Sequence, residues 1–155
     1  MTSSGVAAQV IDRLGAAGAT LSVAESLTGG LLGAELVAVP GASAVFRGGA
    51  LTYATDTKAS VLGVDAELLT VEGPVHPQVA VQMADGARSL FETDVALATT
   101  GVAGPGSADG HPAGTFYVAG TGVGRSPAVR RYLVAGPRAA IRSTAVQVAL
   151  ALLLD

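Results

Sequence analysis

The sequence predicts an α/β domain, a three-layer α/β/α sandwich in which helices cover both faces of a mixed, mostly parallel sheet of about five strands. Short apolar segments typical of buried strands alternate with longer segments whose apolar residues recur at helical spacing. Near the C-terminus two strand-like segments lie close enough in sequence for a hairpin, and a helix-like segment ends the chain. A chain of 155 residues can bury a proper core, so we expect one domain over residues 1–155.

The first half of the chain predicts helices and strands in alternation. Val6, Val10 and Leu14 form the apolar stripe of an amphipathic helix, which the following glycines end. The segment TLSVA is typical of a short buried strand, and a Pro-Gly pair closes the helix that follows it. The expected elements are helix 4–17, strand 20–24, helix 31–39, strand 48–53 and short helices at 56–62 and 65–69.

The second half predicts another helix and strand, a long loop, a hairpin and a final helix. Pro77 stands where a first helical turn tolerates proline, and Val79, Met83, Ala87 and Leu90 share one face. The next strand is hydrophobic on both faces, as a central strand requires. The expected elements are helix 76–91, strand 94–99, loop 100–114, strands 115–122 and 128–135 and helix 137–154.

Composition restricts the classes of function. Cysteine is absent, which excludes disulfides, thiolate metal sites and cysteine nucleophiles. The net charge is −3 and the nine lysines and arginines are scattered, without the basic stripe that binds a nucleic-acid backbone. No apolar run approaches the ~20 residues of a membrane span, and the N-terminus lacks a signal peptide. We therefore expect a cytoplasmic protein that binds neither nucleic acid nor membrane, and a homo-oligomer is compatible with the sequence.

Three turns, of which the first and third bear glycines, follow expected strands at the edge of an open α/β sheet where ligands bind. In the first turn, Ser26 lies where a strand gives way to a helix. Thr28, Gly29 and Gly30 would offer backbone N–H groups at the positive end of the helix dipole, which suits a phosphate or the oxyanion of an acyl-transfer intermediate. The alternative is structural: Ser26 or Thr28 caps the helix and the glycines only allow close packing.

The second turn brings Tyr53 and Lys58 to the same edge as Ser26. A lysine partly desolvated between strand ends loses enough pKa to act as a base toward a serine hydroxyl, the Ser-Lys form of nucleophilic catalysis. The alternative is a solvated lysine that caps the preceding turn, although lysine is rare in this chain.

The third turn offers backbone N–H groups from Thr100, Gly101, Ala103 and Gly104, which could form a nest for an anion. It lacks the Lys-Ser/Thr pair of a Walker A loop and the glycine spacing of the dinucleotide fingerprint. An ordinary Gly-Pro surface loop explains the same spacing equally well.

The two histidines support a weaker alternative. A triad of Ser26, His111 and Asp109 can be drawn, but a histidine and an aspartate two residues apart in one loop give the carboxylate poor geometry for orienting the ring. Two isolated histidines also make a poor metal site, and we expect no metal or organic cofactor.

Four segments stand out as motifs: AESLTGGLLGAEL, VPGASAVFRGGALTYATDTKASVLGV, TTGVAGPG and PAGTFYVA. Together and in this order they resemble the CinA C-terminal domain, the nicotinamide-nucleotide amidase (PncC) family, from about Val6 to Leu154. The resemblance implies a hydrolase that converts nicotinamide mononucleotide to nicotinate mononucleotide and ammonia in pyridine-nucleotide salvage. Relatives often carry a competence/damage-inducible name, and many have an N-terminal molybdopterin-binding-like domain that we do not expect in this chain.

The resemblance also assigns catalytic roles. The family's nucleophilic serine corresponds to Ser26, and its tyrosine and lysine correspond to Tyr53 and Lys58. We expect Ser26 to attack the carboxamide carbon while Lys58, helped by Tyr53, takes the serine proton and returns one to the leaving ammonia. The N–H groups of residues 28–30 would hold the oxyanion.

Binding roles are expected for three further features. Glu25 would either orient Lys58 or bind ribose, and the sequence leaves both roles open. The loop of residues 100–106 and Arg142 are the expected ligands of the 5′-phosphate, because a phosphate favours a bidentate charged donor.

The chain departs from the family at two positions. Leu27 stands where cysteine is usual and is expected to pack inward. His76 stands where serine or threonine usually opens a helix, and would either enter the pocket or weaken the cap. The rival to an amidase is a non-catalytic nucleotide- or partner-binding module, which would not need Ser26, Tyr53 and Lys58 as a set.

Overall fold

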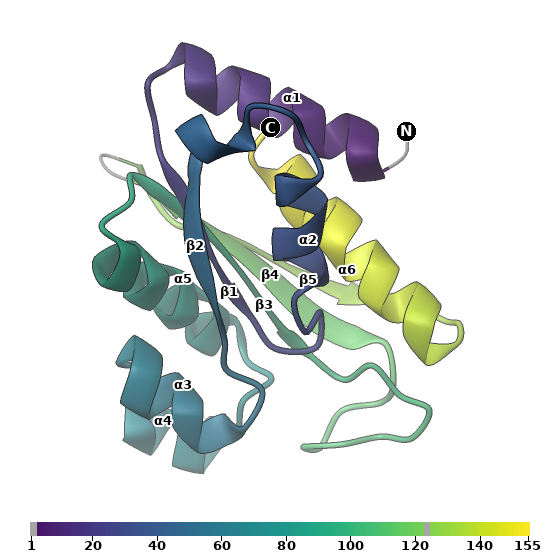
Figure 1. Cartoon of the computed structure of the whole chain (residues 1–155). Helices are drawn as coiled ribbons and strands as arrows, with labels where there is room; N and C mark the ends of the chain where they lie inside the picture. The colour runs from purple at the N-terminus through teal and green to yellow at the C-terminus, as the bar shows by residue number, and fades with distance from the viewer. Residues whose placement is uncertain (1–2, 123–124) are drawn as a thin grey trace.

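The structure, a computed structural model, describes residues 3–122 and 125–155. Strands separated by one or more helices make up the first two thirds of the chain, and a hairpin and a long helix follow (Figure 1). The elements in chain order are α1 Ser3–Ala16, β1 Leu21–Glu25, α2 Leu31–Val37, a 3₁₀ turn Ala42–Ala44, β2 Phe46–Leu51, α3 Thr55–Leu62, α4 Ala66–Glu72, α5 Pro77–Phe91, β3 Val95–Gly101, β4 Thr115–Gly122, β5 Ala128–Leu133 and α6 Arg138–Leu152.

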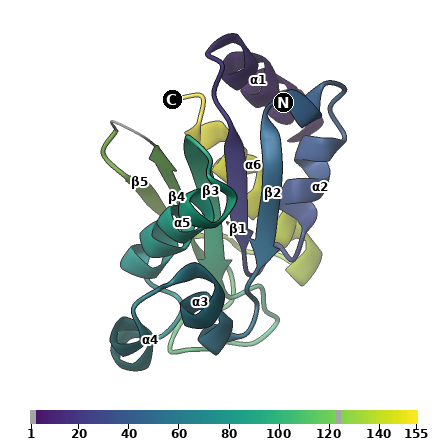
Figure 2. The ribbon, with the colours of Figure 1, turned by 60° about the vertical axis from the view of Figure 1, so that its left-hand side comes forward.

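The strands form one sheet in the order β2-β1-β3-β4-β5, which Figure 2 shows across the molecule. β1 pairs in parallel with β2 and β3, whereas β4 is antiparallel to both β3 and β5. Only β4 therefore runs against the other strands. The carboxyl ends of β1, β2 and β3 meet at one edge, together with the start of β4.

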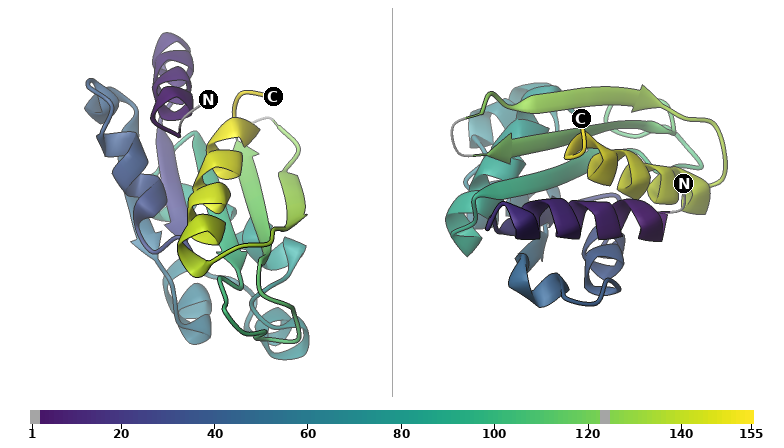
Figure 3. Two further views of the ribbon diagram at one scale, coloured as in Figure 1. Left: turned by 90° about the vertical axis from the view of Figure 1, so that its right-hand side faces the viewer. Right: turned by 90° about the horizontal axis from the view of Figure 1, so that it is seen from above.

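Helices cover both faces of the sheet. α1, α2 and α6 pack on one face, where Leu21, Val23 and Leu97 point into a core that includes Phe116. α1 and α6 lie side by side on this face (Figure 3). α5 packs on the other face, to which the alternating pleat directs Ala24 and other small residues of β1 and β3, while α3 packs against α5 and α4 packs against α3. The predicted three-layer α/β/α sandwich is confirmed.

Small residues bring α5 unusually close to its neighbours. A Cβ atom built on Gly86 of α5 would lie 2.0 Å from the carbonyl oxygen of Leu62 in α3. Because real Cβ atoms do not approach so closely, only glycine allows this packing of α5 against α3. The contact matters for function since α3 carries Lys58.

Two elements need correction: the helix expected over 65–69 extends to Glu72, and the strand expected over 48–53 is shifted. It begins earlier, and β2 is Phe46–Leu51. The two glycines lie inside the strand, where a Cβ on Gly49 would lie 2.5 Å from the Val23 side chain of β1. Close approach between the strands explains them. Because β2 ends at Leu51, Tyr53 follows the strand instead of ending it. No helix in the described part of the chain is long and apolar enough to cross a membrane.

Candidate active site

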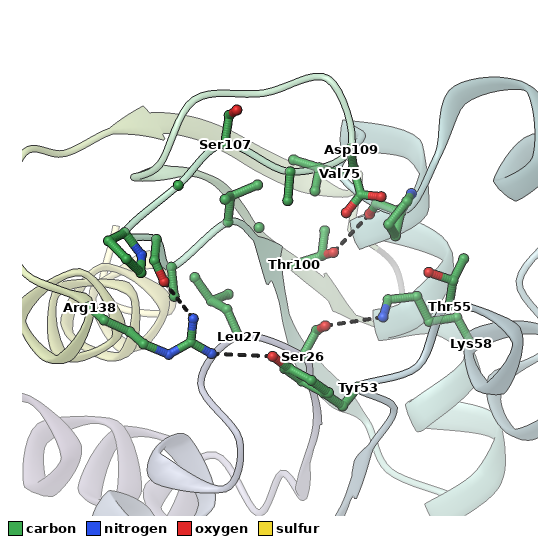
Figure 4. Close-up of a pocket in the computed structure, with 18 residues that line it drawn as sticks. Ser26, Leu27, Tyr53, Thr55, Lys58, Val75, Thr100, Ser107, Asp109 and Arg138 are labelled. Atoms are coloured by element: carbon green, nitrogen blue, oxygen red, sulfur yellow. Dashed lines mark hydrogen bonds between the residues drawn. The ribbon is translucent and has the colours of Figure 1, made fainter.

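The carboxyl edge of the sheet holds a cavity of about 360 Å³ whose walls come from segments far apart in sequence. Ser26 and Leu27 come from the turn after β1, and Tyr53, Thr55 and Lys58 come from the segment after β2. The loop after β3, the start of α6 and the connection between α4 and α5, with Pro74 and Val75, complete the walls (Figure 4). The parallel strands explain the convergence, because their carboxyl ends meet at the same edge.

Ser26 and Lys58 lie in hydrogen-bond contact inside this cavity. The Lys58 Nζ donates to Ser26 Oγ at 3.1 Å and to the carbonyl oxygen of Thr52 at 2.6 Å (Figure 4). The side chain of Lys58 is 1% exposed and that of Ser26 is 7% exposed. The first turn of α3 places the lysine, and the Ser26 N–H donates to the Thr99 carbonyl oxygen of β3 at 3.1 Å, which fixes the serine at the sheet edge.

Burial lowers the pKa of Lys58 to about 8, although the negative charge of Asp109 acts in the opposite direction. Desolvation disfavours the ammonium form because the buried Nζ has lost most of its hydrating water. A lysine with this pKa is partly neutral near pH 8 and can accept a proton from a serine hydroxyl. Lys58 is also the only lysine in the sequence, so the single lysine of this protein is the buried one.

The turn after Ser26 is held by buried polar contacts. The hydroxyl of Thr28 pairs with that of Thr99 at 2.8 Å, and the Gly29 N–H donates to the Ser26 carbonyl oxygen at 3.1 Å. Arg142 of α6 donates from Nε to the Leu27 carbonyl oxygen at 2.8 Å and from Nη2 to the Thr28 carbonyl oxygen at 3.1 Å. Arg142 is therefore a clamp on the turn. It does not line the cavity, which corrects its expected role as a phosphate ligand.

Glu25 also has a different position from either role expected of it. Its carboxylate is 1% exposed and accepts hydrogen bonds from the backbone N–H groups of Gly30, Leu32 and Gly33 at 3.2, 2.9 and 3.1 Å. It thus satisfies the unpaired donors at the start of α2 and complements the helix dipole. Glu25 neither orients Lys58 nor lines the cavity, because its oxygens are occupied on the far side of the turn.

These contacts change which backbone N–H groups can hold an oxyanion: those of Leu27 and Thr28 remain, and those of Gly29 and Gly30 do not. The N–H groups of Gly29 and Gly30 are engaged by Ser26 and Glu25, so neither is free for a substrate. Among the described residues, none accepts the N–H of Leu27 or of Thr28. A trans peptide directs its C=O and N–H in opposite directions, so the bond from Arg142 to the Leu27 oxygen fixes the direction of the Thr28 N–H.

The loop after β3 forms the opposite wall. Thr100, Gly101, Ala103 and Gly104 all line the cavity, as their expected role requires. Within residues 3–122 and 125–155, nothing accepts the N–H groups of Ala103, Gly104, Gly106 or Ser107. The loop therefore presents several unpaired donors beside the cavity, an arrangement that suits an anion.

Arg138 lies beside these donors and was missed by the sequence analysis. Its Nη1 donates to the Gly104 carbonyl oxygen at 2.6 Å and its Nη2 to the Tyr53 hydroxyl at 3.2 Å (Figure 4). Tyr53 is 66% exposed, and its hydroxyl accepts from this arginine instead of contacting Lys58. The available signal was the position of Arg138 just after Pro137, at the start of a helix that begins at the carboxyl edge of the sheet.

The histidines lie outside the cavity wall. His76 is the N-cap of α5, and its Nδ1 accepts from the Gln78 N–H at 3.2 Å, so the cap is kept and the side chain does not enter the pocket. His111 does not line the cavity, whereas Asp109 does.

Leu27 is 3% exposed, as expected of an inward-packed residue. No group of three His, Asp or Glu side chains in the described residues is arranged to hold a metal ion.

Comparison with known proteins assigns the family. The sequence model of the CinA C-terminal domain matches residues 3–155. The chain belongs to the CinA C-terminal domain family. A CinA-like protein from Frankia casuarinae is 50% identical over 132 residues, which cover 85% of this chain and 30% of that protein. A CinA-like protein from Gemmatimonas aurantiaca is 46% identical over 132 residues, which cover 84% of this chain and 31% of that protein.

Solved structures of the CinA family show the same fold. The competence damage-inducible protein A from Klebsiella pneumoniae is 36% identical, with a TM-score of 0.94 over 99% of this chain and 95% of that one. A competence/damage inducible protein from Agrobacterium tumefaciens is also 36% identical, with a TM-score of 0.94 over 98% and 93% of the two chains. The chain spans under a third of the two CinA-like relatives named above, so it corresponds to one part of those longer proteins.

Proposed function

We propose that this CinA-family domain is a nicotinamide-nucleotide amidase, which hydrolyses the carboxamide of nicotinamide mononucleotide to nicotinate mononucleotide and ammonia. The observation that carries the proposal is the 3.1 Å contact between Lys58 Nζ and Ser26 Oγ inside the cavity. A buried lysine whose pKa is about 8 beside a serine is the arrangement of a Ser-Lys nucleophile and base. The substrate comes from the sequence resemblance, and the anion-binding features of the cavity are consistent with its phosphate.

The first half of the reaction acylates the serine. Neutral Lys58 accepts the Ser26 proton as Oγ attacks the carboxamide carbon, and the carbonyl oxygen takes the negative charge. The N–H groups of Leu27 and Thr28 stabilise this oxyanion, since they are unpaired and lie next to the nucleophile. The intermediate collapses as the C–N bond breaks, and protonated Lys58 gives its proton to the departing nitrogen, which leaves as ammonia.

The second half releases the acid. Neutral Lys58 accepts a proton from a water molecule, which attacks the acyl-serine ester. Collapse of the second tetrahedral intermediate breaks the ester bond, and Lys58 returns the proton to Ser26. The products are nicotinate mononucleotide and the free enzyme, so lysine and serine end in their starting protonation states.

The phosphate end of the substrate lies against the loop after β3. Arg138 supplies the charge, and the unpaired N–H groups of Ala103, Gly104, Gly106 and Ser107 supply further donors. This arrangement predicts that the nucleotide is a much better substrate than nicotinamide riboside or free nicotinamide. Comparable kcat/KM for nucleotide and riboside would contradict the phosphate assignment.

The direct test measures ammonia and nicotinate mononucleotide released by the purified protein. Ser26→Ala should lower kcat by about 1,000-fold or more, because the hydroxyl makes the covalent bond, while the fold measured by circular dichroism stays unchanged. A mutant that keeps a tenth of wild-type kcat would remove Ser26 from the role of nucleophile. If the wild-type protein binds the nucleotide but releases no ammonia, the domain is the non-catalytic binding module instead.

A further inference from the structure

Asp109 is the only acidic residue among those that line the cavity. The other charged side chains of the wall, Lys58 and Arg138, are both basic. In Figure 4 Arg138 lies on one side of Ser26, whereas Asp109 lies on the other side, above Lys58. The cavity thus presents a fixed cation at one end and a carboxylate at the other, with the nucleophile between them.

The carboxylate of Asp109 has no direct polar partner in the part of the chain that the structure describes. None of these residues makes a hydrogen bond or salt bridge with it, and it acts on Lys58 only through its charge. It therefore does not hold its own loop together through its charge. An unpaired carboxylate at the wall of a cavity is available to a ligand.

A tight turn fixes the place of this carboxylate. Ala108 and His111 exchange backbone hydrogen bonds of 3.0 and 2.9 Å around Asp109 and Gly110. Asp109 has φ 51° and Gly110 has φ 78°, the left-handed pair that a type I′ turn requires. Asp-Gly and Asn-Gly both suit this turn, so the backbone explains a small polar residue at 109 but not its negative charge.

We propose that Asp109 determines substrate specificity by recognising the positive charge of the pyridinium ring, so that the site selects a carboxamide on a cationic ring over one on a neutral ring. The inference rests on the proposed function. Nicotinamide mononucleotide carries a positive ring at one end and a phosphate at the other, and the cavity carries Asp109 and Arg138 in the complementary order. Opposite charges across a partly enclosed site attract more strongly than they would in bulk water.

The test compares two ligands that differ in ring charge. The second ligand is the 5′-phosphate of 3-ribofuranosylbenzamide, in which a carbon atom replaces the ring nitrogen that bears the ribose, so that the ring is neutral. Binding is measured by calorimetry in the Ser26→Ala background, where the nucleotide is not consumed. We expect the cationic ligand to bind about tenfold more tightly than the neutral one, which corresponds to one weak charge pair.

Asp109→Asn then removes the charge and keeps a residue that the turn accepts. The ratio of the two dissociation constants should fall to about one, mainly through weaker binding of the cationic ligand. Asp12→Asn on α1 is the control for the same change of charge away from the cavity and should leave the ratio unchanged. Circular dichroism and the unfolding temperature establish that each variant keeps the fold.

The outcomes separate this inference from the proposed function. An unchanged ratio in Asp109→Asn, with a wild-type enzyme that releases ammonia, overturns the role of Asp109 alone. A change in kcat without a change in the ratio also overturns it, since the carboxylate would then act only through Lys58. If Ser26→Ala does not bind nicotinamide mononucleotide, the proposed function fails and the inference fails with it.

Discussion

Lys58 determines the pH at which the proposed reaction can run. Its base form is the neutral amine, and burial lowers the pKa at which that form appears to about 8. The protonated lysine cannot accept the Ser26 proton, so activity requires a pH near or above this value. The rate should therefore fall on the acidic side, as for any general base, but at a higher pH than for a base that is a carboxylate of ordinary pKa.

The expected pH profile follows from the loss of activity when Lys58 is protonated. kcat/KM for nicotinamide mononucleotide should rise about tenfold per pH unit below the pKa and level off above an apparent pKa of about 8. Lys58→Met should remove the activity at every pH. A profile that is flat from about pH 6 to about pH 9, or a Lys58→Met variant that stays active, would assign the base to another group.

Arg138 and Arg142 should affect different kinetic constants. Arg138→Met removes a charged donor from the cavity wall and should mainly raise KM, with a loss of about 1.5–3 kcal/mol in kcat/KM. Arg142→Met releases the carbonyl oxygens of Leu27 and Thr28 and should mainly lower kcat, because the oxyanion donors lose their alignment. Steady-state kinetics on the nucleotide distinguish the two, and the reverse pattern would restore Arg142 as the phosphate ligand.

At the scale of elements, Glu25 joins the end of β1 to the start of α2. Three backbone N–H groups of the turn and helix donate to one buried carboxylate. The N-cap residue of α2 is Gly30, which has no side chain to accept from the helix N–H groups. The carboxylate of Glu25, five residues earlier in the sequence, accepts from them instead. Glu25 thereby holds together the two ends of the turn that carries Ser26, the end of β1 and the start of α2.

Glu25→Gln should therefore destabilise the domain. The neutral amide loses the charge that complements the helix N-terminus and replaces one acceptor oxygen with a donor, which we expect to cost about 1–3 kcal/mol of unfolding free energy. Urea unfolding followed by circular dichroism measures it. Glu67→Gln, an exposed residue in the first turn of α4, is the matched control and should change stability by less than about 0.5 kcal/mol.

The contact between α3 and α5 gives a second prediction at this scale. Gly86→Ala would place a methyl group against the Leu62 carbonyl oxygen and force α3 away from α5. We expect a loss of about 2 kcal/mol or more in stability, together with lower kcat because Lys58 moves with α3. Gly15→Ala in α1 has ordinary space, with its nearest atom at 3.6 Å, and should be neutral or stabilising.

The sequence predicted the elements well because their signals are local. Buried strands read as continuous apolar runs, and amphipathic helices repeat at their own period, so each element could be placed without knowledge of its neighbours. The meeting of Ser26 and Lys58 followed from the rule that parallel strands end at one edge. The start of β2 was placed two residues too late, because Phe46 and Arg47 carry no local signal that distinguishes them from the preceding turn, and their strand conformation depends on pairing with β1.

The roles of single charged residues were harder to predict because they depend on long-range packing. Arg138 and Arg142 lie one helical turn apart, about 6 Å along the axis of α6, and no local pattern indicates which of them reaches the cavity. A carboxylate at a turn is equally suited to cap a helix or to bind a substrate, so Glu25 could not be assigned. Which of these residues reaches the cavity is decided only when the strands, turns and α6 come together at the edge of the sheet.

At the scale of the whole molecule, the catalytic lysine should reduce the stability of the fold. The pKa of Lys58 is 10.5 in a free side chain and about 8 in the folded protein. Between these two values the unfolded state binds more protons than the folded state, so stability rises with pH across this window. Below about pH 8 the lysine is charged in both states, and the folded protein bears the full cost of burying the ammonium group.

Lys58→Met should consequently stabilise the domain while abolishing activity. Methionine keeps an unbranched apolar side chain without the charge, so we expect a gain on the order of 1–3 kcal/mol at pH 7, reduced by the lost hydrogen bond to the Thr52 carbonyl oxygen. The gain should shrink as pH rises from about 8 to 10.5, because the wild-type lysine becomes neutral there. Urea unfolding of both proteins at several pH values measures the difference. A gain that stays constant with pH would show that the lysine is not desolvated in the folded state, which would also remove the physical basis for its action as a base near pH 8.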